Sequence, residues 1–331
     1  MFNWTTKKLS YAGKIQLINS IVFGIVNFWC GIPILPQSVL RKIDQLCSQF
    51  LWGAFDNRKM VFIGWKTLCR PKSLGGVGIK EALSWSKVST LAWLSKAAAT
   101  SENSLWKKWI THSYLKNADI WMVTKKNTDS AAWKNLLSQR DKFQNKLTVG
   151  TSIQGLMATW LKNNRFCKSK AYSFLVSADP APKCFMWDKV IVPKHAFVMY
   201  LAAKKSLATS DNIMARGFNI PSRCPLCEHA LDSLTHIFFN CSYSQEVLIY
   251  IFTWCGIRRR PLSLKQEINR LEFFSTHRRR TTKMKKLMCS FAAVVYLVWI
   301  ERNLRIFEGS KKEASFLAQT IIGIVSMRLE L

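Results

Sequence analysis

Acidic residues are scarce in this sequence of 331 residues, which has 19 Asp and Glu against 49 Lys and Arg and a formal net charge of +30. No two aspartates are adjacent. Because polymerase chemistry needs paired carboxylates that hold two divalent metal ions, the sequence predicts no such site. We therefore expect that the chain is not an enzyme. A charge of this size is usually offset by a polyanion, most often a nucleic acid.

Other signals are missing as well. There is no phosphate loop of the pattern G-x-x-x-x-G-K, no secretory signal at the N-terminus and no apolar run of the roughly 20 residues that a membrane-spanning helix needs. Seven of the ten cysteines are scattered along the chain, so a disulfide framework is not expected. These features predict an intracellular, reducing location, compatible with the nucleus, and no membrane partner.

The remaining three cysteines stand together with one histidine in a pattern C-x2-C-x8-H-x4-C within eighteen residues. Three sulfurs and one imidazole suit a closed, tetrahedral zinc site that leaves no open position for a substrate. The pattern predicts one structural Zn²⁺ ion, and the alternative is four reduced residues that coincide by chance. His229 is a competing ligand, but it follows Cys227 too closely for easy ring closure. The predicted ligands are Cys224, Cys227, His236 and Cys241.

Local sequence also predicts how these ligands meet. Pro225 fixes φ in the first turn, which frees the next two amides to point at the Cys224 sulfur. Asp232 or Ser233 can cap a short helix that carries His236. Five residues turn about 140° around an ideal helix, so that helix must end near residue 240 for Cys241 to reach the metal ion.

The fold class we expect is mainly α. Apolar residues at helical spacing predict helices over residues 14–29, 39–52, 79–99, 193–206 and 282–308, and a short strand that leads into a helix is expected over residues 164–175. His195 lies near a helix start without a local carboxylate partner, which favours a structural or solvent-facing role over catalysis. Four segments are expected: a helical region over residues 1–110, a connecting segment over 111–159, a zinc region over 160–247 and a basic helical region over 248–331.

Several phrases in the first hundred residues carry a family resemblance. They are Leu9-Ser10-Tyr11-Ala12-Gly13-Lys14-Ile15-Gln16-Leu17-Ile18, Phe50-Leu51-Trp52-Gly53, Cys69-Arg70-Pro71-Lys72 and Gly75-Gly76-Val77-Gly78-Ile79. The stretch resembles the region after the polymerase palm in plant LINE-type (non-LTR) retroelement reverse transcriptases. The resemblance implies a helical thumb or connection that contacts the template and primer.

A second resemblance follows in the same order along the chain. Its matching residues are Pro193-Lys194, Leu207, Asp211, Gly217, Cys224-Pro225-Leu226-Cys227, His236-Ile237-Phe238-Phe239-Asn240-Cys241 and Ser244. They resemble the reverse transcriptase zinc-binding domain of these plant elements, which implies the same four zinc ligands. The last aspartate is Asp232, so no aspartate-based ribonuclease H site is expected after it. A palm-containing reverse transcriptase would be a compatible protein partner.

Runs of basic residues follow the zinc pattern, and the only acidic residues among them are Glu267 and Glu272. Phosphate contacts of this kind give an affinity that depends on salt but not on sequence, whereas single basic runs are more often a solvated helix face. We expect them to contact RNA or DNA. The residues are Arg258, Arg259, Arg260, Arg278, Arg279, Arg280, Lys283, Lys285 and Lys286.

The last expected helix places Leu287, Phe291, Val294 and Val298 on one stripe, which can pack inside the molecule or against a partner helix. The function hypothesis is a non-catalytic, zinc-containing, nucleic-acid-binding fragment of a retroelement reverse transcriptase. The alternatives are a zinc-stabilised protein-interaction module and a decayed remnant without a selected function.

Overall fold

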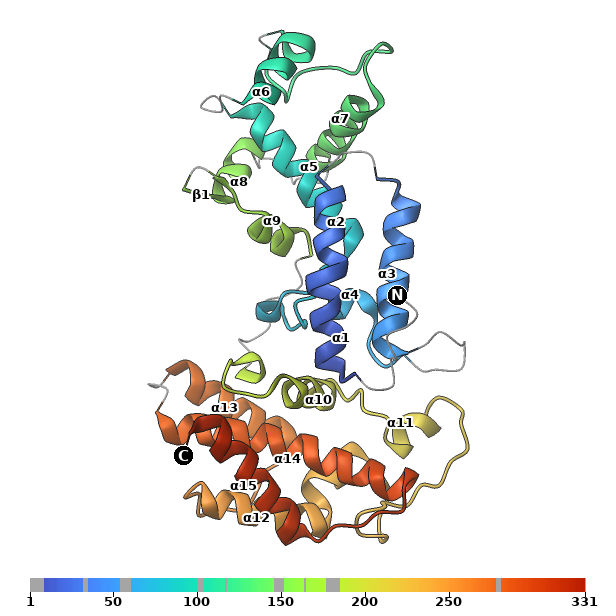
Figure 1. Ribbon diagram of the computed structural model, residues 1–331, viewed down its shortest axis with the longest axis vertical. Coiled ribbons are helices and arrows are strands. Elements are labelled where there is room, and N and C mark those ends of the chain that lie inside the picture. The colour runs from blue at the N-terminus through green and yellow to red at the C-terminus, as the bar shows by residue number, and fades with distance from the viewer. Residues whose placement is uncertain are drawn as a thin grey trace. The chain divides into compact units, whose positions relative to one another are not determined.

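The computed structural model describes residues 9–31, 35–53, 61–99, 104–116, 118–145, 152–163, 165–176, 185–277 and 281–330. Almost all of its regular structure is helical, and the named strands β1 (Leu161–Lys162) and β2 (Arg165–Phe166) pair antiparallel. The expected mainly α class is confirmed (Figure 1).

Contacts divide the chain into two compact units. Unit 1 comprises Met1–Lys14, Met60–Gly64 and Ala181–Leu331, and unit 2 comprises Ile15–Lys59 and Trp65–Pro180. The expected zinc region starts within unit 2 and ends inside helix α12 (Ser242–Trp254) of unit 1. The division into four segments stays a prediction.

The first helical stretch is continuous and consists of α1 (Tyr11–Leu17), a π-helical turn η1 (Ile18–Val22) and α2 (Phe23–Trp29). Its residues up to Lys14 belong to unit 1, and unit 2 begins at Ile15. The next helix, α3 (Gln37–Trp52), ends at Gly53 in the left-handed conformation (φ 66°), as its sequence predicted. Its buried stripe contains Leu40, Asp44, Cys47 and Leu51. Val39 and Leu46, which also stand at helical spacing, are exposed instead.

Asp44 is buried because it joins α3 to the elements that follow. Its Oδ1 accepts hydrogen bonds from Trp65 Nε1 (3.0 Å) in α4 (Trp65–Leu68) and from the amide of Ala82 (2.9 Å) at the start of α5 (Ala82–Ala98). The carboxylate thus supplies the cap that the α5 N-terminus lacks in its own N-cap residue, Glu81.

The turn between α4 and α5 contains the short 3-10 helix η2 (Lys72–Leu74) and depends on glycine. Gly75 and Gly78 have positive φ angles of 75° and 81°, and a Cβ on Gly76 would lie 2.0 Å from the Arg70 carbonyl oxygen. Tyr172 of α9 (Lys168–Leu175) packs here, and its hydroxyl accepts from the Glu81 amide (2.8 Å) and donates to the Cys69 carbonyl (2.9 Å). The rest of unit 2 consists of α6 (Leu105–Ile110), η3 (Thr111–Leu115), α7 (Ala131–Gln144) and α8 (Ile153–Thr159).

Unit 1 is built around α14 (Thr282–Phe307), which packs against α10 (Pro193–Ala203), α12 and α15 (Ala314–Leu329) (Figure 1). Its further elements are η4 (Phe185–Trp187), α11 (Ser210–Met214), η5 (His236–Asn240) and α13 (Leu264–His277). Three members of the predicted stripe on α14, Phe291, Val294 and Val298, are buried. Among the described residues, this stripe therefore packs inside the unit, which was the favoured alternative.

α14 is long and apolar enough to cross a membrane by length and composition, although 61% of the relevant window is buried within the protein. It also carries the buried charged residues Glu301 and Arg302. Both observations fit the core helix of unit 1, since buried core helices pass the same test.

Candidate metal centre

Residues 222–232 form a small hairpin with the first two cysteines at its tip. The Asp232 amide donates to the Ser222 carbonyl (2.7 Å) and the Cys224 amide to the Ala230 carbonyl (2.7 Å). The tip closes with a bond from the Glu228 amide to the Cys224 carbonyl (2.8 Å), and Glu228 takes a left-handed φ of 63°. The amides of Leu226 and Cys227 donate to the Cys224 sulfur, as Pro225 predicted. These amides stabilise a thiolate at that position.

The third and fourth ligands are positioned by η5, a single π-helical turn. Ser233 Oγ accepts from the His236 amide (3.3 Å), so Ser233 provides the predicted cap. The Cys241 amide donates to the His236 carbonyl (2.8 Å), and Cys241 itself is extended (ψ 130°). The helix ends at Asn240 as expected, because the wider π turn brings the fifth residue back over the first.

Cys241 also lies directly before the N-terminus of α12. The amides of Tyr243 and Ser244 donate to its sulfur, and a hydrogen bond from the Cys224 thiol is the largest influence that lowers the Cys241 pKa. The same bond, reinforced by burial, raises the pKa of Cys224. The helix N-terminus favours negative charge, which is the form in which a cysteine binds metal.

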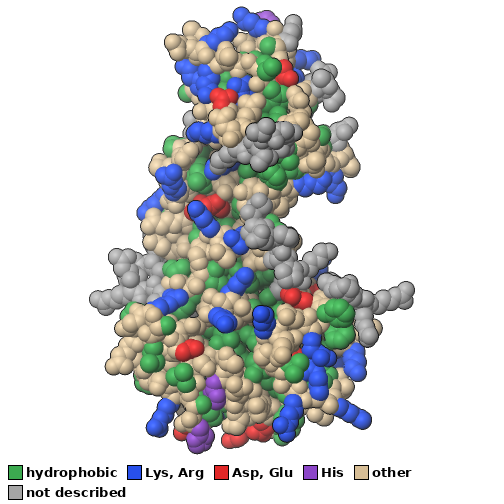
Figure 2. Space-filling view, turned by 180° about the vertical axis from the view of Figure 1, so that it is seen from behind, with side chains coloured by type: hydrophobic (Ala, Val, Ile, Leu, Met, Phe, Trp, Pro, Cys, Tyr) green, Lys and Arg blue, Asp and Glu red, His purple; other side chains and the backbone are tan. Residues whose placement is uncertain are grey.

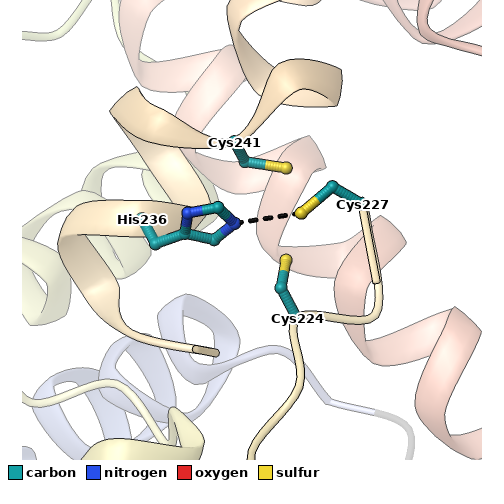
Figure 3. Close-up of side chains that lie close together, drawn as sticks. All are labelled: Cys224, Cys227, His236 and Cys241. Carbon is teal, nitrogen blue, oxygen red and sulfur yellow. Dashed lines mark hydrogen bonds between the residues drawn. The ribbon is translucent and has the colours of Figure 1, made fainter. Parts of the chain in front are cut away.

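The four donor atoms lie within 4.8 Å of one another, and Cys227 Sγ is 3.2 Å from His236 Nε2 (Figure 3). A tetrahedral site with Zn–S bonds of about 2.3 Å has donor atoms about 3.8 Å apart, so these residues fit one Zn²⁺ ion with little movement. His229 is exposed and not part of the group. The donor set is complete without an open position, which makes the site structural rather than catalytic.

Two arginines of helix α14 bind the hairpin. The guanidinium of Arg302 forms a buried ion pair with Asp232, whose carboxylate also accepts from the Ser210 amide and hydroxyl, both at 2.8 Å. Arg305 Nη1 donates to the carbonyl of Leu226 (2.9 Å) between the two cysteines. These contacts were not predicted. Charged residues inside an otherwise apolar helix are the sequence signal that could have found them.

The residues that the sequence predicts to contact nucleic acid differ in their exposure and in their partners. Arg258 and Arg260 are exposed, whereas Arg259 pairs through two hydrogen bonds with the buried Glu267 (2.6 and 2.7 Å), which raises the arginine pKa. Arg278, Arg279 and Arg280 lie outside the described residues.

Lys283, Lys285 and Lys286 follow on the first turns of α14. Lys286 Nζ lies 3.6 Å from the Trp254 ring centroid and donates to the Trp254 carbonyl (3.0 Å), and Lys283 approaches Gly256. Lys285 is exposed. The fold thus brings Lys283 and Lys286, far along the chain, to the C-terminal end of α12, just before Arg258.

His195 is buried against Tyr296, with ring centroids 4.5 Å apart, and burial lowers its pKa to about 4. It is therefore a neutral, structural residue, as its position suggested.

Comparison with known proteins adds to this geometry. Residues 166–247 match the family described as zinc-binding in reverse transcriptase. This region contains all four cluster residues, and together with the two relatives described below it supports a zinc-binding region of a retroelement reverse transcriptase. The match also includes α9 of unit 2, whereas the helix that braces the hairpin, α14, lies beyond its end.

Two proteins of Arabidopsis thaliana are similar to parts of the chain. The "Putative ribonuclease H protein" is 29% identical over 142 residues, which cover 41% of this chain and 22% of that protein. An uncharacterized mitochondrial protein is 24% identical over 123 residues, covering 36% of this chain and 79% of that protein. The chain thus matches about a fifth of the first relative's length.

Proposed function

We propose that the chain is a non-catalytic, nucleic-acid-binding part of a LINE-type (non-LTR) retroelement reverse transcriptase, in which a structural zinc ion braces the binding surface. The observation that carries this proposal is the net charge of +30 on a chain whose zinc cluster matches a reverse transcriptase family. Figure 2 shows many more basic than acidic side chains on one face of the molecule. Such a surface attracts phosphate backbones by counterion release.

The cluster at the end of α12 offers the clearest phosphate contacts. We define it as Arg258 and Arg260, which follow the helix, with Lys283, which approaches Gly256, and Lys285 of the same first turns of α14; all four are exposed. Arg259 is left out because its guanidinium is held by Glu267. The partial negative charge at the C-terminus of α12 stabilises cations beside it, so these groups can gather without a bound anion.

The buried carboxylates support the non-catalytic part of the proposal, since each has a structural role. Asp44 caps α5, Asp232 pairs with Arg302, Glu267 with Arg259 and Glu301 with Arg305. A carboxylate that binds catalytic Mg²⁺ must instead face substrate. We also propose an intracellular, reducing location, because the described cysteines outside the cluster are unpaired thiols.

The test is equilibrium binding of the zinc-loaded full chain to labelled RNA and DNA across a salt series. We expect log affinity to fall linearly with log salt, and the Arg258→Glu/Lys285→Glu variant to lose roughly 0.7 to 0.9 of slope per contact removed. Lys42→Glu, an exposed charge reversal on α3, is the matched control. Absence of binding at low salt, or binding indifferent to salt, would rule the proposal out. Polymerase and nuclease assays with Mg²⁺ or Mn²⁺ should both show no activity.

A further inference from the structure

A cavity of about 840 Å³ opens on unit 1, apart from the cluster at the end of α12. Its walls come from the start of α1, from α10, from the chain leading into the zinc hairpin and from the C-terminal half of α14. Arg223 and Pro225 are in the wall, so the zinc hairpin directly shapes one side. The lining is mainly apolar.

The charged lining residues all have one sign. They are Lys194, Arg223 and Arg302, and none of the described residues that line the cavity is acidic. Arg302 is neutralised by Asp232, but Lys194 and Arg223 are exposed and form no ion pair within the described part of the chain. The lining thus holds two cations without a counter-charge among the described residues, which suits an anionic occupant.

Aromatic rings make up much of the remaining lining. Phe307 is 78% exposed and Tyr11 38%, while Tyr296 and Trp299 are half-buried. The Tyr296 ring stacks on His195 and has the Lys194 ammonium 5.2 Å from its centroid, and the Arg302 guanidinium lies 5.0 Å from the Trp299 ring centroid. The strongly exposed Phe307 ring is therefore the best stacking surface in the lining, and cations lie beside the other rings. Aromatic rings interleaved with cations are the usual means by which proteins hold unpaired bases and their phosphates.

We propose that this cavity binds a single strand of nucleic acid, with a base stacked on the exposed Phe307 ring and phosphates held by Lys194 and Arg223. A duplex cannot bind in this way because its base faces are already stacked on one another. The inference rests on the proposed function and specifies the form of the nucleic acid and its place.

The experiment measures binding of fluorescein-labelled oligo-U, oligo-dT and a duplex of equal length to the zinc-loaded full chain. Lys194→Glu/Arg223→Glu should weaken oligo-U and oligo-dT binding by at least tenfold and lower the salt slope by about 1.4. Phe307→Ala should weaken single-strand binding by roughly fivefold or more, because a stacked base is lost. Both variants should leave duplex binding nearly unchanged.

The control variants make the same kinds of substitution at residues that do not line the cavity. Lys204→Glu reverses an exposed charge just after α10, and Phe316→Ala removes an exposed ring from α15 (54% exposed). Both should bind like the unchanged chain. Circular dichroism and zinc content confirm that each variant is folded.

A second readout locates the strand directly. Oligonucleotides that contain 5-iodouracil should photocrosslink to Tyr11, Tyr296, Trp299 or Phe307. Mass spectrometry identifies the crosslinked residue. Crosslinks confined to other surfaces, or equal effects of cavity and control variants, would overturn the cavity proposal while salt-dependent binding remained intact. Loss of all nucleic-acid binding in the unchanged chain would instead overturn the proposed function. Preferential capture of an apolar peptide by the cavity, with oligonucleotides unbound there, would also overturn the inference.

Discussion

The two units join distant parts of the chain by different means. In unit 1 a Cys₃His cluster closes residues 224–241, and the resulting hairpin is fastened to α14 by Arg302 and Arg305. In unit 2, Asp44 and Tyr172 join segments through hydrogen bonds to backbone amides and carbonyls. Among the described residues, the group of side chains that could hold a metal ion lies in unit 1. Unit 1 should therefore depend on metal and redox conditions, and unit 2 should not.

Metal removal should give the largest difference between the units. Chelation, or Cys224→Ser with Cys241→Ser, should abolish hydrogen-exchange protection over residues 220–242, since a structural zinc ion contributes on the order of 10 kcal/mol to small sites. Helices α3 and α5 of unit 2 should keep their protection. Hydrogen exchange with mass spectrometry and zinc analysis measure both effects.

Cys255→Ser is the matched control, because Cys255 is a buried cysteine of unit 1 outside the cluster. It should keep about one zinc ion per chain. A chain that holds no zinc ion, or whose residues 220–242 are indifferent to chelator, would contradict the prediction.

The buried ion pair behind the hairpin should have the next largest effect. Arg302→Met leaves Asp232 buried without its counter-charge, which should cost about 3 to 5 kcal/mol of the unfolding free energy of unit 1. The double variant Asp232→Asn/Arg302→Met should recover much of this loss, because no uncompensated charge remains. Denaturant unfolding followed by hydrogen exchange in α14 measures both.

A double variant no more stable than Arg302→Met would show that the charge is not the cause. Lys311→Met offers a matched control, since its ion pair with Glu228 is exposed and such pairs contribute little.

Much of this architecture could be read from the sequence where the cause was local. The spacing of Cys224, Cys227, His236 and Cys241 predicted the cluster, and Pro225 and Ser233 behaved as their chemistry indicates. Helix ends at Gly53 and near Asn240 were equally local. Each of these depends on bonds within a few residues.

What escaped prediction depends on contacts across long stretches of chain. Asp44 binds the amide of Ala82, which lies 38 residues away. Arg302 meets Asp232 across 70 residues, and Lys286 meets Trp254 across 32. No periodicity encodes such pairings, which is why the contacts between α14 and the hairpin were not predicted.

Unit 2 should show a smaller but sharply placed effect at Asp44. Asp44→Ala removes the acceptor for the Ala82 amide and the Trp65 indole, which should cost about 2 kcal/mol, as expected for loss of a helix cap whose donors stay buried. The loss should appear first as faster hydrogen exchange in the first turn of α5, and zinc content should not change. Asp129→Ala, which removes one hydrogen bond in an exposed turn, should cost less than about 0.5 kcal/mol. If Asp44→Ala instead released zinc, the hydrogen-bonded unit and the metal-braced unit would not be independent, and the contrast between them would fail.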